Sequence, residues 1–155
     1  MRVAFGADHA GFELKERLKR ELERRGHEVV DLGTDSTQPV DYPDFCFPVA
    51  ERVARGEVER GVVLGGSGIG EAIAANKVAG VRAAVVTSEE TARLTRLHND
   101  SNVLALGART NPDHDAVARW LEVWLETGFE GGRHVARLRK IEQYERAARS
   151  SAGRV

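Results

Sequence analysis

A glycine-rich run followed directly by a carboxylate has the clearest chemical potential in this sequence. The run consists of Gly65, Gly66, Ser67, Gly68, Ile69 and Gly70, and Glu71 follows it. Glycine backbone can approach a ligand closely and turn successive N–H groups toward one point, where they bind anions or developing negative charge. Glu71 could remove a proton from a carbon beside a carbonyl while the loop holds the resulting enediolate. The alternative is a tight strand-to-helix turn.

The glycine-rich run does not match two other known glycine-containing motifs. A nucleotide-hydrolysing phosphate loop requires Lys-Ser or Lys-Thr where this chain has Glu71, and a nucleophile elbow requires a different spacing around Ser67. The pKa of Glu71 is subject to opposing effects, because a helix N-terminus lowers it and desolvation raises it. The sequence leaves the balance between them open.

Two histidines are further candidates for proton transfer or hydroxyl binding. His98 stands at the end of a predicted helix, where an imidazole can exchange protons near neutral pH, although a helix C-cap is the alternative. Asp8 and His9 directly follow a predicted strand and can bind hydroxyls. His27 and His114 have the sequence context of surface residues. No spacing of His, Asp and Glu predicts a metal site, and we expect no cofactor.

Three arginines match the charge of a phosphate dianion. Arg133 and Arg137 are four residues apart, so on a helix they face the same way, and Arg109 follows the last predicted strand. The alternative for the helical pair is a solvated face.

Short apolar runs alternate with helical patterns, which predicts an α/β fold with parallel strands and helices on both faces of the sheet. The expected strands are Val3–Phe5, Val29–Leu32, Val62–Leu64, Val81–Val86 and Val103–Leu106. Ligands of such sheets bind beyond the carboxyl ends of the strands, where strand order reverses. The segments that follow the strands should therefore carry the chemistry.

The helical patterns give five crossover or flanking helices and one extra C-terminal helix. Leucines recur every four residues before Gly26, and a second helix is expected at 44–55 with Pro48 in its first turn. Another begins inside the glycine run, the next opens at Thr87 with a capping box to Glu90, and the fifth ends before Gly128. The inward residues expected of the Thr87 helix are Leu94 and Leu97. The last helix, at about 134–148, is expected to turn Val135, Leu138, Ile141 and Tyr144 inward, against its own sheet or a neighbouring subunit.

Composition restricts the class of protein. The 155 residues are 41% apolar and 30% charged with a net charge of −1, which predicts one globular domain at 1–149, a frayed tail at 150–155, and no nucleic-acid or membrane partner. The single cysteine, Cys46, excludes an intramolecular disulfide, suits a reducing compartment, and is interpreted as a small buried hydrophobe. We expect a cytoplasmic protein.

Six separated motifs, spanning Val3 to about Glu145, resemble ribose-5-phosphate isomerase B and its sugar-phosphate isomerase relatives. They are Gly6-x-Asp8-His9-x-Gly11-Phe12, Asp41-Tyr42-Pro43, Gly66-Ser67-Gly68-Ile69-Gly70, Ala74-Ala75-Asn76-Lys77, His98-Asn99-Asp100-Ser101-Asn102-Val103-Leu104 and Glu130-Gly131-Gly132-Arg133-His134. The resemblance implies a Rossmann-like three-layer α/β/α sandwich that forms homodimers or tetramers with active sites at the interface. It also implies a branch in which glycine stands at position 65 and Glu71 is the base, instead of a cysteine at position 65.

The same resemblance implies roles for individual residues. The sugar would be held by Asp8, His9, Ser67 and Asn99, His98 would open the furanose ring, and the phosphate would be bound by Arg109, Arg133 and Arg137. The implied reaction interconverts ribose 5-phosphate and ribulose 5-phosphate. Isomerisation of a hexose 6-phosphate such as allose 6-phosphate, or binding without catalysis as a sensor, are the alternatives.

Overall fold

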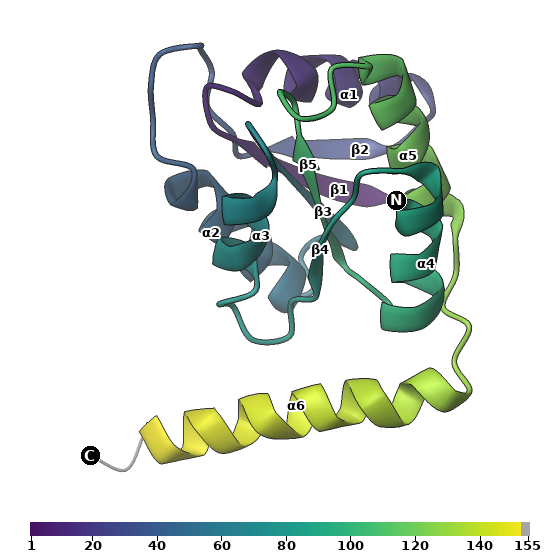
Figure 1. The fold of residues 1–155 in the computed structure, drawn as a ribbon. Coiled ribbons are helices and arrows are strands. Elements are labelled where there is room, and N and C mark those ends of the chain that lie inside the picture. The colour runs from purple at the N-terminus through teal and green to yellow at the C-terminus, as the bar shows by residue number, and fades with distance from the viewer. Residues whose placement is uncertain (153–155) are drawn as a thin grey trace.

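The computed structural model describes residues 1–152 and contains a five-stranded parallel sheet in the order β2-β1-β3-β5-β4 (Figure 1). In chain order the strands are β1 Arg2–Ala7, β2 Glu28–Asp31, β3 Arg60–Gly65, β4 Ala83–Val85 and β5 Val103–Gly107. The chain runs outward from β1 to β2 and then returns to the other side of β1 with β3. Strand order therefore reverses between β1 and β3, the position at which such sheets bind ligands.

Helices cover both faces of the sheet, which confirms the three-layer α/β/α sandwich (Figure 1). The helices are α1 Phe12–Arg24, α2 Pro43–Ala54, α3 Ile69–Ala75, α4 Glu89–Asn99, α5 His114–Glu126 and α6 Arg133–Ala152. One core cluster joins α1, α4 and α5 to alternate residues of β1, β3 and β5, such as Phe5 and Leu64. The other joins α2 and α3 to the opposite alternation, such as Ala4 and Val63. Strands buried on both faces explain the near-continuous apolar runs.

Three local predictions were wrong. The cap of α4 is Ser88, whose hydroxyl accepts from the Thr91 N–H at 3.1 Å, so the capping box lies one residue later than Thr87 and ends in a threonine. Pro48 is the sixth residue of α2, in its second turn rather than its first. The strand β4 begins only at Ala83, where the N–H groups of Arg82 and Ala83 donate to the side-chain oxygens of Asn102 and Asn76 rather than to a neighbouring strand.

The inward faces of two helices also differ from the prediction. Leu94 of α4 is 37% exposed and Leu97 half-buried, because α4 turns Ala92 and Thr95 toward the protein. On α6, Leu138 is buried as expected, but Ile141 is 48% and Tyr144 78% exposed.

Helix α6 runs across the end of the molecule, outside the layers of the sandwich (Figure 1). It continues to Ala152, so residues 150–152 of the predicted frayed tail are helical, while 153–155 lie outside the described residues. Within residues 1–152, the helices lack the combination of length and apolar character that crossing a bilayer requires.

Candidate active site

The glycine loop joins β3 to α3 at the carboxyl edge of the sheet, as the sequence predicted. Gly68 caps α3 with a φ of 78°, a left-handed conformation that suits glycine, and a Cβ there would lie 3.0 Å from the Leu106 backbone. The turn after β5 is hydrogen-bonded to the loop, because the N–H groups of Ala108 and Arg109 donate to the Gly65 and Gly66 carbonyls at 2.8 and 3.0 Å. The loop is therefore held against two neighbouring strands.

Gly65 makes room for the carboxyl group of Glu71. A Cβ on Gly65 would overlap Oε1 and Cδ of Glu71 and lie 3.0 Å from its Oε2. Glu71 is only 3% exposed although it stands in the first turn of α3. The Glu71 carboxylate thus occupies the space that a side chain at position 65 would fill.

Burial decides the direction in which the pKa of Glu71 moves. Desolvation is the largest cause and raises the pKa of Glu71, and the nearby Asp8 carboxylate raises it further. Hydrogen bonds from the backbone N–H groups of Glu71 and Gly68 oppose this effect without reversing it. The question that the sequence left open is settled in favour of desolvation, which brings a glutamate closer to the range useful for a general base.

Cys46 lies within the electrostatic reach of the same carboxylates. It is fully buried on α2, and desolvation together with the charges of Glu71 and Asp8 raises the pKa of its thiol. A thiol in these surroundings stays protonated, which agrees with the interpretation of Cys46 as a small buried hydrophobe.

Part of the predicted nest of N–H groups is available to a ligand. The Ile69 N–H donates to the Ser67 hydroxyl at 3.2 Å, and the Gly68 N–H faces the Glu71 carboxylate. Among residues 1–152, no acceptor binds the N–H groups of Gly66 and Ser67. These two groups are donors that the loop can offer to an oxygen beside Glu71. The Ile69 side chain is 57% exposed.

Asp8 and His9 follow β1, directly beside the glycine loop. The Asp8 carboxylate is buried and accepts from the Ala10 and Gly11 N–H groups at 2.9 and 3.1 Å. His9 Nδ1 accepts from the Val40 N–H at 3.1 Å, which assigns the ring proton of a neutral His9 to Nε2. His9 therefore presents a donor to its surroundings.

His9 and Arg109 line one cavity of about 370 Å³ at this edge. Thr37 and His114 line it too, and sequence reasoning missed both. His114 is not the surface residue that its context suggested, since it is half-buried and its Nε2 lies 3.1 Å from the Ala108 carbonyl. Its position as the first residue of α5, at the end of the segment that follows β5, was the available signal.

Tyr42, part of the Asp41-Tyr42-Pro43 motif, was not among the predicted site residues, yet it lies beside the glycine loop. Its ring lies over Gly70, where a Cβ would come within 2.6 Å of the ring carbon Cζ. Tyr42 is the N-cap of α2 and 36% exposed, so its ring covers the first turn of α3 while remaining accessible.

The remaining predicted site residues lie at the opposite edge of the sheet. His98 and Asn99 end α4, which leads into the amino end of β5, and Arg133 and Arg137 stand in α6. The Asn102 carbonyl accepts from the N–H of Gly61, near the start of β3, which places this turn at the amino edge. Since the six residues of β3 span about 17 Å, one chain cannot bring His98 to Glu71.

His98 is part of a compact cluster with Glu130 and His134. The imidazoles of His98 and His134 stack with ring centroids 4.4 Å apart and an interplanar angle of 18°. A Glu130 carboxylate oxygen lies 3.8 Å from His98 Nε2 and 3.6 Å from His134 Nε2.

The sequence spacing did not reveal this group of three possible metal ligands. A shared ion must lie near the plane of each imidazole that binds it, at about 2.0–2.1 Å from the nitrogen. Nearly parallel stacked rings do not share such a point, so we assign no metal to the cluster.

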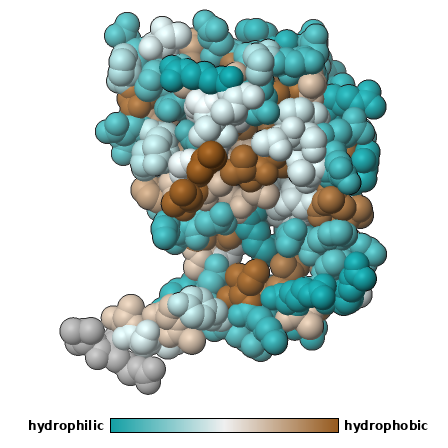
Figure 2. Space-filling view, viewed as in Figure 1, coloured by the Kyte–Doolittle hydropathy of each residue, from teal (hydrophilic) through white to brown (hydrophobic). Residues whose placement is uncertain are grey.

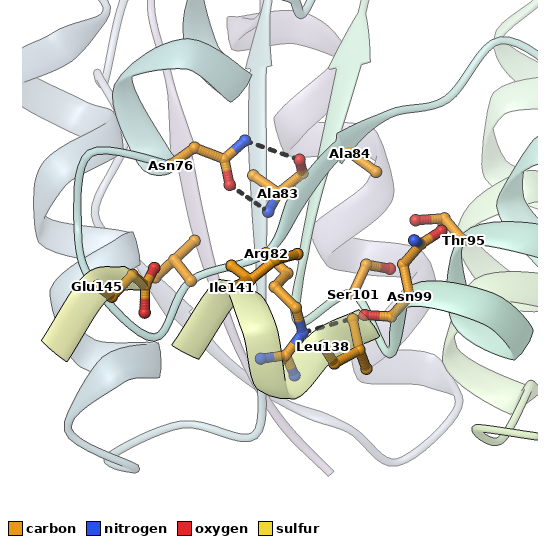
Figure 3. A pocket seen from close by; sticks show the side chains of 11 residues that line it. Asn76, Arg82, Ala83, Ala84, Thr95, Asn99, Ser101, Leu138, Ile141 and Glu145 are labelled. Atoms are coloured by element: carbon orange, nitrogen blue, oxygen red, sulfur yellow. Dashed lines mark hydrogen bonds between the residues drawn. The ribbon is translucent and has the colours of Figure 1, made fainter. Parts of the chain in front are cut away.

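Asn99 lines a hollow of about 390 Å³ between α6 and the edge strand β4 (Figure 3). Arg82 crosses its floor and donates to the Asn99 and Asp100 carbonyls at 3.0 and 2.9 Å. Leu138 and Ile141 of α6 form the apolar wall (Figure 3). Neither Arg133 nor Arg137 forms an ion pair within the described residues, so both remain available to an anion.

Comparison with known proteins identifies the family. The model of the ribose/galactose isomerase family matches residues 3–141. This chain belongs to that family. Ribose-5-phosphate isomerase B of Escherichia coli is 44% identical over 93% of this chain and 96% of its own length. The solved structure of ribose-5-phosphate isomerase B from Clostridium thermocellum superimposes with a TM-score of 0.93 at 47% identity, covering 96% of this chain and 99% of that one.

A third comparison concerns a ligand. Ribose-5-phosphate isomerase B of Mycoplasma genitalium, solved with bound ribulose 5-phosphate, gives a TM-score of 0.90 at 39% identity over 94% of this chain and 96% of that one. The range matched to the ribose/galactose isomerases contains both edges of the sheet that carry predicted site residues. The resemblance drawn from six sequence motifs is confirmed.

Proposed function

We propose that this isomerase interconverts ribose 5-phosphate and ribulose 5-phosphate through an enediolate, with Glu71 as the base. The observation that carries the proposal is the Glu71 carboxyl group, buried against Gly65 with a raised pKa beside the free N–H groups of Gly66 and Ser67. Close relatives and a ligand-bound structure named for this reaction support the choice of a pentose phosphate over a hexose phosphate.

The reaction needs one proton to move between two carbons. After ring opening, Glu71 removes the proton from C2 of the aldehyde, and the electron pair enters the C1–C2 bond to form the enediolate. The Gly66 and Ser67 N–H groups stabilise the developing oxyanion, a contribution that is worth about 10²–10³ in rate per donor. Glu71 then returns the proton to C1 as the proton on O2 passes to O1, which leaves the C2 ketone.

A complete site requires two copies of the chain. Asp8, His9, the glycine loop, Glu71 and Arg109 lie at the carboxyl edge of the sheet, whereas His98, Asn99, Arg133 and Arg137 lie at the amino edge. In a two-fold symmetric dimer the carboxyl edge of each copy meets the amino edge of the other, so two identical sites form together. His98 of one copy would then donate a proton to the ring oxygen of sugar held by the other.

Exposed apolar residues provide surfaces for this association. Ile69 and Ile73 on α3 are each 57% exposed, and Figure 2 shows apolar atoms gathered on this face of the molecule. Ile141 and Tyr144 form a second exposed apolar surface, on α6. Both surfaces lie next to one of the two groups of site residues.

The phosphate group would bind to arginines from both copies. Arg109 and His9 line one cavity, and Arg133 and Arg137 follow each other on one turn of α6. None of these arginines has a carboxylate partner within residues 1–152, which fits a site for a dianion.

The first experiment tests the chemistry. Wild-type protein and Glu71→Gln are incubated with ribose 5-phosphate in deuterated water, and proton exchange at C2 is followed by NMR. The wild type should exchange C2 and accumulate ribulose 5-phosphate, and Glu71→Gln should bind the sugar without exchange. A wild type that binds ribose 5-phosphate but exchanges nothing would be a sensor rather than an isomerase.

The second experiment tests whether the site is shared. Glu71→Gln and His98→Asn, each with little activity, are unfolded together, refolded as a mixture and assayed. Half of the dimers are then mixed and contain one intact site, which restores about a quarter of the wild-type activity. The same variants refolded separately are the control. A mixture no more active than its components, despite proven mixed dimers, contradicts the shared site.

A further inference from the structure

We propose that His134 is a positioning residue that holds the His98 imidazole in place for opening the sugar ring. The proposal rests on the proposed function, because His98 is the ring-opening acid there. It assigns a task to a buried histidine that lies with His98 at the edge of the sheet opposite Glu71. Three observations carry it: the two rings are stacked, His134 is buried, and its segment is attached to α4.

The two stacked histidines differ in freedom. The side chain of His98 is 36% exposed and ends α4, whereas the His134 residue is only 6% exposed. The ring centroids lie 4.4 Å apart with an interplanar angle of 18°, so one face of the His98 ring is stacked on the buried His134 ring. Such an aromatic pair restricts the orientation of the more exposed partner.

The backbone around His134 is attached to the helix that carries His98. The Glu130 N–H donates to the Leu97 carbonyl at 3.0 Å, one residue before His98. Gly131 and Gly132 then turn with φ of 72° and 57°, and the His134 N–H returns to the Gly131 carbonyl at 3.2 Å. The turn therefore places His134 directly over the end of α4.

The charge state of His134 suits a support rather than a second acid. Burial, the nearby His98 and the positive charge of Arg133 lower the pKa of His134, and Glu130 opposes them. A neutral His134 does not compete for the proton that His98 has to donate. Its Nε2 is buried and makes no hydrogen bond within residues 1–152, and the Glu130 carboxylate lies 3.6 Å away, so the ring contacts His98 by its face rather than by a hydrogen bond.

The two directions of the reaction separate this role from general packing. Ribose 5-phosphate is mostly a closed furanose and must be opened. Ribulose 5-phosphate is an open chain, because the hydroxyl that would close its ring carries the phosphate. Exchange of the C1 proton of ribulose 5-phosphate with solvent needs Glu71 and the glycine loop but no ring opening. A variant that disturbs only His98 should therefore lose activity on ribose 5-phosphate and keep the exchange of the C1 proton of ribulose 5-phosphate.

The test compares His134→Ala, His134→Phe and the wild type in the full-length protein. For His134→Ala, kcat/KM with ribose 5-phosphate should fall about two- to tenfold, the range of an aromatic pair. Its rate of C1 deuterium incorporation into ribulose 5-phosphate should stay at the wild-type value. The phenyl ring of His134→Phe keeps the stack, so it should restore most of the forward rate. Val135→Ala, a truncation of the next residue on α6, controls for loosening of the helix and should leave both rates unchanged.

Two results would overturn the proposal. Equal losses in both assays for His134→Ala would mean that the residue supports the fold or the dimer rather than His98. A His134→Phe variant as impaired as His134→Ala would mean that the imidazole itself is needed. If the wild type shows neither reaction, the proposed function fails instead, so the two failures are distinguishable.

Discussion

Replacing Gly65 by alanine should remove activity by displacing the Glu71 carboxyl group. The added Cβ would overlap Oε1 and Cδ of Glu71, and the carboxyl group must move by on the order of 1 Å or more to restore ordinary contacts. Misplacement of a reacting group by about 1 Å costs on the order of 10² in rate. We therefore expect kcat for ribose 5-phosphate to fall at least about 100-fold in Gly65→Ala.

The same overlap has a cost in folding stability that depends on Glu71. Extra volume in a packed site costs about 1–3 kcal/mol, which for a chain of this length lowers Tm by roughly 2–12 °C. In a Glu71→Ala background the overlapping atoms are absent, so adding Gly65→Ala should cost little. The two substitutions are thus expected to be coupled by about 1–3 kcal/mol in a double-mutant cycle.

The assays are steady-state kinetics for the single variant and urea unfolding for the four members of the cycle, at one protein concentration. Gly128→Ala is the matched control, because a Cβ at Gly128 meets no atom within 4 Å. It should match the wild type in both assays. Near-normal activity in Gly65→Ala, or an equal stability loss with and without Glu71, would refute the steric reasoning.

Two further predictions concern buried charges. Because burial raises the pKa of folded Glu71 above its ordinary value of 4.5, the unfolded chain ionises first as the pH rises, and the folded state loses stability between the two pKa values. Glu71→Gln removes that loss, so its stability relative to the wild type should increase from pH 4 to pH 7 in urea titrations; a constant difference would contradict the raised pKa. Arg96 is 3% exposed and donates to the Ser101 and Thr127 carbonyls at 2.6 and 3.1 Å. Arg96→Met should therefore lower the free energy of unfolding by about 1.5–3 kcal/mol in urea titrations. The control is Arg93→Met at an exposed position, which should lower it by less than about 1 kcal/mol.

The carboxyl-edge half of the site could be predicted from the sequence because it follows from topology. Alternating strands and helices require parallel strands, and parallel strands bring the residues after each one to a common edge. Asp8, Glu71 and Arg109 lie at that edge for this reason. The spacing of the glycines indicated that a ligand could approach the backbone closely. The sequence did not show why position 65 is a glycine, because the reason is a tertiary contact: the Glu71 carboxyl group occupies the space of a side chain there.

The sequence identified the site residues of the amino edge, but it did not show that they lie at a different edge of the sheet from Glu71. His98 ends a crossover helix, and a crossover helix returns the chain to the amino edge, so the same topology already separates His98 from Glu71. The stack of His98 on His134 joins residues 36 positions apart, and no periodicity encodes it. Ile141 and Tyr144 continue the apolar stripe of α6 beyond the buried Leu138, but residues 1–152 leave both exposed.

The separation of the two halves has a consequence for how the proposed catalyst is assembled. Glu71 is desolvated by its own chain, through Gly65, the α3 turn and the nearby Asp8, so the base has its raised pKa before any association. In the single chain His98 is partly exposed and Arg133 and Arg137 of α6 are exposed, and in the proposed dimer a second copy would cover them. Activity should therefore depend on dimer formation through the acid and the phosphate contacts, while proton abstraction depends on a pocket that a single fold already provides.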